Sequence, residues 1–234
     1  MTEVLVTGAT SGIGRAMART LHAAGYRVVA LGRNAKALAE LAAEGIEILA
    51  LDLADLRALS ALQGRPIDVL VNNAGIMPKP GPFAEMSAVE IDQTLAVNLA
   101  SVLHLTQAVV PGMIARGAGH VVFTGSTAAH APGANFAAYA ASKAGIAAFA
   151  TALRAEISPH GIRVTELVPG RVETGLYSAV LPDAARGDMY ANGNSLQPQD
   201  LADALLAVLS LPTRATVTRL DILPTRPVPA IRLK

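Results

Sequence analysis

The stretch VTGATSGIGR, residues 6–15, stands between a short apolar run and the first segment with helical spacing. Its glycines, Gly8, Gly12 and Gly14, follow the pattern G-x-x-x-G-x-G, which departs from the common dinucleotide fingerprint G-x-G-x-x-G. Glycine lets a backbone approach a pyrophosphate closely, and the free N–H groups and dipole of a helix N-terminus attract that anion. A glycine cluster alone could be only a tight strand-to-helix turn. Its place after the first strand of an alternating pattern favours nucleotide binding.

Short β-branched runs alternate with Ala- and Leu-rich segments of helical spacing along most of the chain. The strand candidates are residues 3–7, 27–31, 46–51, 67–72, 120–125, 163–168 and 217–222. Strands that are apolar on both faces and separated by helices predict a parallel sheet covered on both sides. We therefore expect an α/β fold: one Rossmann-type, doubly wound domain over residues 1–234, with a seven-stranded, mostly parallel sheet and helices on both faces.

One irregular region interrupts this alternation at about residues 171–198. It contains Gly175, Pro182, Gly187, Gly193 and Pro198. A loop of this length in a compact domain is usually functional, often as a lid. We expect a lid over a substrate site, and its mixture of apolar, Arg and Asn side chains suits a small, partly polar carbonyl or hydroxy compound.

The composition narrows the classes of function. Of the 234 residues, 52% are hydrophobic and 16% are charged, and the formal net charge is +1. So small a charge, without a basic run, predicts neither a nucleic-acid partner nor a membrane partner. The chain has no cysteine, which excludes disulfides, thiolate nucleophiles and Cys-ligated metals. The N-terminus leads straight into an apolar run with no room for a signal peptide, and we expect a cytoplasmic protein.

The end of the second predicted strand bears on which nucleotide binds. Enzymes that use NAD usually place Asp or Glu there to hold the ribose hydroxyls. Here the sequence is ALGRN, with Gly32 at the carboxylate position and Arg33 after it, and Arg15 can face the same place. Two guanidiniums suit a 2′-phosphate, because Arg binds phosphate through paired, charge-assisted donors. Both arginines could instead be ordinary surface residues. We expect NADP(H), with NAD(H) as the alternative.

Further motifs follow in order at the ends of the predicted strands. They are LDL (51–53), NNAG (72–75), Asn98 in a long helix, GSTA (125–128), YAASK (139–143) and VPGRVET (168–174). With the glycine loop, they make the chain resemble the classical short-chain dehydrogenase/reductase family over nearly its whole length. The short length, the GRN turn and the ending LDILPTRPV look more like the small NADP-dependent 3-hydroxy-acid/serine dehydrogenase branch than like the acyl-carrier reductases.

The resemblance implies hydride transfer between NADP(H) and a small carbonyl compound or secondary alcohol. Tyr139 would be the general acid/base, but a free phenol has a pKa near ~10. Lowering it by roughly three units requires about 4 kcal/mol of preferential stabilisation of the phenolate. Lys143, one helical turn away, can supply part of this as a nearby cation. The resemblance also implies that Ser126 binds the substrate oxygen and that Asn98 holds a water for proton relay.

The resemblance assigns a further set of residues to the cofactor, with Asp52 accepting from the adenine amino group and Thr174 binding the carboxamide. The predicted cofactor-binding residues are Gly8, Thr10, Ser11, Gly12, Ile13, Gly14, Arg15, Arg33, Asp52, Leu53, Asn72, Ala74, Gly75, Tyr139, Lys143, Pro169, Gly170, Val172 and Thr174. Arg171 is unusual within the pattern PG-x-x-x-T and could face solvent.

The resemblance and the composition together predict a homo-oligomer with twofold symmetry, and a tetramer is favoured over a dimer. The helical segments 89–115 and 137–158 are apolar over more of their circumference than a one-sided core contact needs. The apolar residues in excess are Leu95, Leu99, Val102, Leu103, Val109, Ala147, Ala148, Ala152 and Leu153. The stretch 89–115 also carries enough polar residues that we do not expect a membrane span.

Three other readings remain beside this one. A nucleotide-sensing protein without chemistry would share the fold, but such relatives typically lose the Tyr/Lys pair. An epimerase or dehydratase needs a larger C-terminal substrate domain than the roughly sixty residues after Gly170. A metalloenzyme is disfavoured, because the five histidines show no ligand spacing and are expected at the surface or at helix caps. They are His22, His104, His120, His130 and His160.

Overall fold

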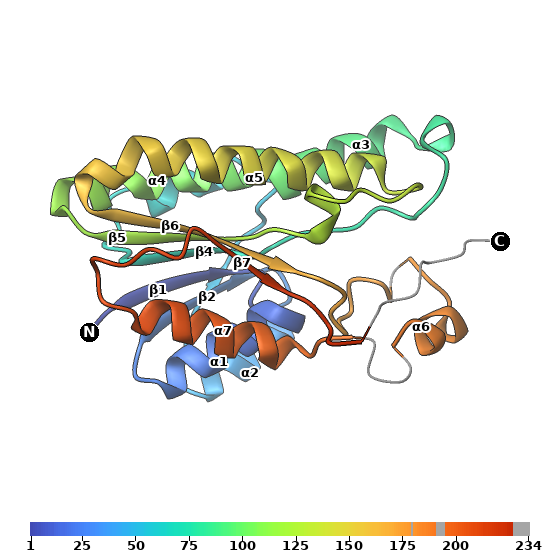
Figure 1. Ribbon diagram of the computed structural model, residues 1–234. Helices are drawn as coiled ribbons and strands as arrows, with labels where there is room; N and C mark the ends of the chain where they lie inside the picture. Colours follow the sequence, from blue (N-terminus) through green and yellow to red (C-terminus); the bar gives the residue numbers. More distant parts are fainter. Residues whose placement is uncertain (179, 191–194, 227–234) are drawn as a thin grey trace.

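The computed structural model describes residues 1–178, 180–190 and 195–226. Within this part of the chain, one sheet has the strand order β3-β2-β1-β4-β5-β6-β7, and each neighbouring pair is parallel (Figure 1). The strands are β1 (Glu3–Thr7), β2 (Arg27–Gly32), β3 (Glu47–Ala50), β4 (Val69–Asn72), β5 (Gly119–Thr124), β6 (Ile162–Pro169) and β7 (Arg219–Ile222). Each overlaps its predicted range, and the expected doubly wound α/β fold is confirmed.

Helices cover both faces of this sheet, with α1, α2 and α7 on one face and α3, α4 and α5 on the other (Figure 1). Their bounds are α1 (Gly12–Ala23), α2 (Ala35–Ala43), α3 (Ala88–Leu95), α4 (Ser101–Arg116), α5 (Ala137–Ile157) and α7 (Pro198–Ser210). Strand β1 shows why two layers are needed. Leu5 packs into the core under α4 and α5, whereas Val4 and Val6 pack under α1 and α7. Successive strand residues point to opposite faces, so an apolar strand must be covered on both.

The apolar stretch 89–115, expected as one helix, forms α3 and α4 with the π-helical stretch Ala96–Ala100 between them. A π-helical turn is rare and often marks a functional site, and Asn98 lies at the centre of this one. By length and composition the run Ala88–Arg116 could cross a membrane, but half of its most apolar window is buried inside the molecule. This is the burial that a helix covering a sheet requires.

The predicted lid region contains one short helix, α6 (Asp183–Tyr190). The two ends of the predicted lid region lie side by side, because Val172 and Leu196 form an isolated parallel bridge. The amide of Leu196 also donates to the carbonyl of Arg171 at 2.8 Å. Residues 179 and 191–194, which also belong to the predicted lid, lie outside the described residues. The role of this region as a lid stays a prediction.

One histidine differs from the expectation of a surface or capping position. His120, on β5, is only 1% exposed, and its Nε2 lies 2.8 Å from the hydroxyl of Thr165. Burial, and after it the charge of Arg163, lowers the pKa of His120 to about 3. His120 is therefore a neutral core residue. Within the described part of the chain, no group of three His, Asp or Glu side chains could hold a metal ion.

Candidate active site

A continuous cavity of about 1530 Å³ runs along the carboxyl edge of the sheet. Residues at or just after the ends of all seven strands line it: Gly8, Gly32, Asp52, Asn73, Gly125, Gly170 and Leu223. In open α/β sheets, ligands bind at this edge where the strand order reverses. Here that point lies between β1 and β4, whose chains continue to opposite faces of the sheet (Figure 1). The place and length of the cavity suit a dinucleotide and a small second ligand.

Gly8 and Gly12 shape the cavity at this point. Their φ angles are 65° and 48°, in the left-handed region that glycine enters without a steric penalty. A Cβ on Gly8 would lie 2.8 Å from the Cα of Ala74, and one on Gly12 would lie 3.1 Å from the Thr174 methyl group. The loop thus presents bare backbone at the N-terminus of α1, where an anionic pyrophosphate is favoured.

The end of β2 forms one end of the cavity, with Gly32 and Arg33 in its wall. Gly32 carries no carboxylate, and a Cβ there would lie 2.4 Å from the methyl carbon of Thr10, so any side chain at this position would require Thr10 to shift. Arg33 forms an ion pair with Asp52 at 3.3 Å, and both side chains are substantially exposed. A hydrogen bond from the backbone of Ala54 and then the Arg33 guanidinium hold the pKa of Asp52 below its usual value.

Arg15 and Gly14, two of the predicted cofactor-binding residues, do not line the cavity. Arg15 Nε donates to the carbonyl of Thr10 at 3.1 Å, and its guanidinium pairs with Glu40 of α2 at 3.4 Å. The contact of Arg15 and Gly14 with the cofactor stays a prediction. A Cβ on Gly14 would lie 2.4 Å from the carbonyl oxygen of Gly8, so Gly14 allows α1 to pack closely on the loop.

Asn72, another predicted cofactor-binding residue, also lies outside the cavity wall, and its contact with the cofactor stays a prediction. It is the last residue of β4, is 4% exposed and donates to the hydroxyl of Thr106 on α4 at 3.2 Å. Its neighbour Asn73 lines the cavity instead. Asn73 Nδ2 donates to the carbonyl of Thr7, and Thr124 donates to Asn73 Oδ1. The period-two alternation along β4 could have distinguished the two asparagines.

The other predicted cofactor-binding residues all line the cavity. They are Gly8, Thr10, Ser11, Gly12, Ile13, Arg33, Asp52, Leu53, Ala74, Gly75, Tyr139, Lys143, Pro169, Gly170, Val172 and Thr174. The described cavity wall also includes Asn34, whose side chain caps α2 by accepting from the amide of Ala37. A polar residue directly after Arg33 was the signal that could have indicated it.

Tyr139 and Lys143 lie one turn apart on α5 and reach the cavity wall, although they are only 7% and 5% exposed. Lys143 Nζ donates to the carbonyl of Thr124 at 2.9 Å. Ser126 is hydrogen-bonded to the Tyr139 phenol, and its Oγ also accepts from the amide of Ala128 at 3.1 Å. The structure therefore brings the predicted Ser126, Tyr139 and Lys143 to the same part of the cavity.

Burial governs the titration of both helix residues. It raises the pKa of Tyr139 to about 12, although the hydrogen bond with Ser126 acts to lower it. Burial lowers the pKa of Lys143 to about 8, although the Glu166 carboxylate acts to raise it. Desolvation disfavours the charged form of each group. The groups that act on the Tyr139 pKa are burial, Ser126 and Tyr177, and the expected lowering by Lys143 is not seen among them. A cation bound beside the phenol would lower the pKa.

Asn98 lies behind the cavity and outside its wall. Its Oδ1 accepts from the amide of Ile76 at 2.8 Å, and its Nδ2 donates to the carbonyl of Ile76 and to the hydroxyl of Ser142. A Cβ on Gly75 would meet both Asn98 Oδ1 and Lys143 Nζ within 3.6 Å. Asn98 therefore fixes the loop after β4 next to the lysine. Its part in a proton relay stays a prediction.

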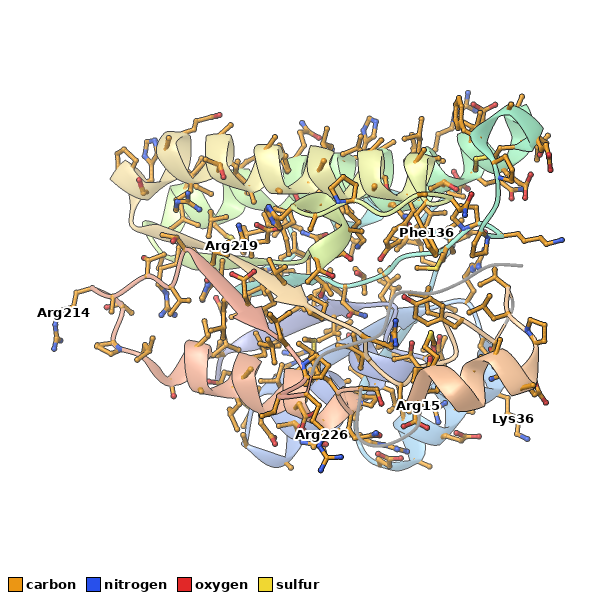
Figure 2. All side chains as sticks on the ribbon, turned by 45° about the vertical axis from the view of Figure 1, so that its right-hand side comes forward. Arg15, Lys36, Phe136, Arg214, Arg219 and Arg226 are labelled. Carbon is orange, nitrogen blue, oxygen red and sulfur yellow. The ribbon has the colours of Figure 1, made fainter. Side chains whose placement is uncertain are left out.

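The cavity continues past Tyr139 to the start of α5, where Phe136 lies (Figure 2), and Arg226 also lines it. Arg171 and Tyr177 also line this part. Arg171 Nη1 donates to the carbonyl of Met189 in α6 at 3.2 Å, and burial lowers the pKa of Arg171. Arg171 thus lines the cavity. From the sequence, a position facing solvent had been the alternative. Only 3% of the residues are aromatic, and this rarity could have singled out Phe136 and Tyr177 as candidate cavity residues.

Comparisons with known proteins bear directly on this cavity. The family model for short chain dehydrogenase matches residues 2–185. The chain is 44% identical over 224 residues to the uncharacterized short-chain type dehydrogenase/reductase y4eK of Sinorhizobium fredii, covering 94% of this chain and 90% of that one. It is 34% identical over 233 residues to the NADP-dependent 3-hydroxy acid dehydrogenase YdfG of Salmonella typhi, covering 94% of each. The closed form of serine dehydrogenase complexed with NADP+ matches with a TM-score of 0.92 at 31% identity, covering 100% of this chain and 99% of that one.

These matches extend over nearly the whole chain and include the glycine loop, the strand ends and α5. Two of these proteins are a 3-hydroxy acid dehydrogenase and a serine dehydrogenase, which is the branch that the sequence motifs indicated. The resemblance inferred from those motifs is confirmed, and this chain belongs to the short-chain dehydrogenase/reductase family.

Proposed function

We propose that the protein is an NADP(H)-dependent oxidoreductase that interconverts a small carbonyl compound and its secondary alcohol. One observation carries this proposal: a single cavity joins Ser126, Tyr139 and Lys143 to a wall that bears Arg33 and, at Gly32, no carboxylate. The NADP-dependent relatives support the same cofactor.

The residues of the cavity fit this cofactor. Gly8 and Gly12 leave bare backbone at the N-terminus of α1 for the pyrophosphate. Arg33 supplies a guanidinium for the 2′-phosphate, while Asp52 lies beside it for the adenosine. Pro169 and Thr174 line the wall near Tyr139, on the side proposed for the nicotinamide. When bound, NADP(H) supplies or accepts the hydride.

The chain's own residues position the substrate oxygen and move its proton. Ser126 donates a hydrogen bond to the oxygen, and Tyr139 gives it a proton in reduction or removes one in oxidation. Lys143 stabilises the phenolate form by its charge, and the carbonyl of Thr124 fixes the ammonium at 2.9 Å. The nearly complete burial of Tyr139 and Lys143 limits solvent screening, so charges at this site interact strongly.

A small 3-hydroxy acid or its oxo acid is the substrate class that we favour. Arg171 places a half-buried guanidinium in the wall, and Tyr177 interacts electrostatically with both Arg171 and Tyr139. A guanidinium binds a carboxylate through paired, charge-assisted hydrogen bonds. The 3-hydroxy acid dehydrogenase activity of YdfG supports this class. Residues 171–198 act as the lid over this site.

The proposed assembly is a cytoplasmic homo-oligomer of single-domain subunits, a tetramer rather than a dimer. Of the helix residues expected in excess, Val102, Val109 and Leu153 are buried in the core. Leu95 is 36% exposed and Val89 of the same helix 63% exposed, which leaves an apolar face on α3. Light scattering at micromolar concentration tests this, and a mass near 24.0 kDa would mean a monomer.

Absorbance at 340 nm tests the reaction. The purified chain is mixed with NADPH and a panel of small 3-oxo acids, each matched with its methyl ester. We expect NADPH oxidation with the acids and at least about tenfold lower kcat/KM with the esters, since a charge-assisted hydrogen bond is worth about 1.5–3 kcal/mol. NADPH binding without turnover on any compound would instead indicate a nucleotide sensor.

A further inference from the structure

Glu166 is a buried carboxylate near the reacting end of the cavity, and the mechanism above gives it no task. It belongs to β6 and is 5% exposed. Its Oε1 accepts no hydrogen bond within the described part of the chain. A buried carboxylate is costly unless nearby positive charge compensates it. The basic side chains around Glu166 therefore decide how well its charge is compensated.

The carboxylate presses against the backbone that carries the reacting groups. A Cβ on Gly125 would lie 2.4 Å from Oε1 of Glu166, so only glycine leaves room for it there. Gly125 connects Thr124, whose carbonyl receives the Lys143 ammonium, to Ser126. Glu166 thus lies directly behind the segment that holds both Lys143 and Ser126.

Three basic side chains from different elements lie near this carboxylate or interact electrostatically with it. Lys143 comes from α5, His130 from the turn after Ser126, and Arg219 from β7, where Figure 2 labels it. His130 Nε2 lies 3.5 Å from Glu166 Oε1, and Arg219 Nη1 lies 3.3 Å from His130 Nδ1. Arg219 is also paired with Asp221 on its own strand.

The three basic side chains differ in burial. Those of His130 and Arg219 are 29% and 42% exposed, so solvent screens their interaction with Glu166. Lys143 is 5% exposed, and Glu166 is the group that acts to raise its pKa against the effect of burial. A charge is felt most strongly where water is excluded. The partner that gains most from the Glu166 charge is therefore Lys143.

We propose that Glu166 is a positioning residue of the active site, whose buried negative charge keeps Lys143 in its ammonium form beside Tyr139. His130 and Arg219 are the outer neighbours of the same carboxylate, and Asp221 balances Arg219. Glu166 acts through Lys143 and contacts neither reactant.

The consequence for turnover rests on the proposed function, whereas the charge coupling itself does not. Lys143 must be positive to stabilise the phenolate of Tyr139 and to hold the cofactor ribose. A neutral Lys143 would do neither well. The coupling is therefore tested without cofactor, and its effect on the reaction is tested separately.

The direct test is an NMR titration of Lys143 in chain labelled with ¹³Cε and ¹⁵Nζ lysine. The chain has four lysines, and the Lys143→Arg variant assigns the signal of interest. In the parent we expect a midpoint near pH 8. Glu166→Gln removes the charge at similar volume and should lower that midpoint by about one pH unit or more, because an opposite charge nearby favours the charged form.

Two further variants separate charge from structure. Asp221→Asn makes the same carboxylate-to-amide change one strand away and should move the midpoint by less than about 0.3 units, since its charge is screened and paired. Glu166→Asp keeps the charge and should stay within about 0.3 units of the parent. A Glu166→Gln midpoint no lower than that of Asp221→Asn would overturn the proposal. If Glu166→Gln does not fold, a low midpoint in folded Glu166→Asp would overturn it equally.

A second arm follows NADPH affinity by fluorescence between pH 6 and 9. For Glu166→Gln we expect affinity to fall about tenfold relative to the parent above the lowered Lys143 midpoint and to match it below. Affinity that is reduced equally at every pH would indicate a merely structural role and would contradict the proposal. A shifted midpoint in a parent chain that turns over no substrate would leave the coupling intact and overturn only the proposed function.

Discussion

The two ends of the cavity use charge in opposite ways. At the Arg33 end, the ion pair with Asp52 is open to solvent, with side chains 64% and 46% exposed. Such pairs contribute about 0–1 kcal/mol and rearrange readily. At the Tyr139 end, the phenol and the ammonium are almost fully buried, and burial moves their pKa values to about 12 and about 8. In the proposed function, cofactor choice depends on a screened and adjustable contact, whereas the reaction depends on charges that few alternative groups could replace.

Replacing the phenol should give the largest effect. We expect Tyr139→Phe to lower kcat by at least about a hundredfold, the low end for loss of a general acid/base. NADPH affinity should stay within about twofold, because the ring and its packing remain. Steady-state kinetics and fluorescence titration check the two halves. Activity above a few per cent of the parent would remove Tyr139 from its role.

Replacing Lys143 should weaken NADPH binding and also lower kcat. A change at the exposed Arg33 end should affect cofactor binding alone. Lys143→Ala removes the buried cation, so we expect at least about a tenfold loss in NADPH affinity and a comparable or larger loss in kcat. Lys36→Ala, on the exposed face of α2, is the matched control and should change neither. A Lys143→Ala variant with parental affinity would show that the ammonium does not hold the cofactor.

A pair of arginine variants tests the exposed end of the cavity and compares the two arginines that were predicted to bind the cofactor. Arg33→Ala should raise the KM for NADPH about tenfold and leave the KM for NADH nearly unchanged, because only the former carries a 2′-phosphate. Arg15→Ala should have a clearly smaller effect, since Arg15 is held by Thr10 and Glu40. Equal losses in the two variants would restore the sequence-based view that both arginines face the phosphate.

The smallest effect concerns stability, at a buried group away from the cavity. The folded chain keeps His120 neutral down to about pH 3, whereas the unfolded chain takes up this proton below about pH 6.5. The unfolded state thus binds more protons in this window, and His120 makes stability fall as pH falls, by up to about 1.4 kcal/mol per pH unit. Urea unfolding of His120→Gln between pH 6 and 4 should show this slope reduced. His160→Gln, at an exposed site, should keep the parental slope.

The fold could be predicted because its signals are local. Alternating apolar runs indicate each strand, and the glycine loop and YAASK have fixed spacing that places them at a strand end and on one helix face. The sequence did not show contacts that depend on long-range packing. Asn72 donates to Thr106, Arg15 pairs with Glu40, and the position of His120 on β5 buries it.

Glu166 shows the same limit at the site itself. Nothing in RVTELV distinguishes its carboxylate from an ordinary strand residue, because its neighbours come from α5, β7 and the turn after Ser126. The pattern of the sequence predicts which residues carry the reaction. The charged groups around those residues come from distant parts of the sequence, so their proximity can be seen only in the folded structure.

The most direct test of the central claim follows the hydride itself. The chain is incubated with NADPH that carries deuterium at the transferable C4 position and with the 3-oxo acid that is turned over fastest, and the hydroxy product is weighed by mass spectrometry. The account predicts a product one deuterium heavier at the carbinol carbon, formed by the parent and not by Tyr139→Phe. Hydroxy product without deuterium, or equal labelled product from Tyr139→Phe, would contradict it.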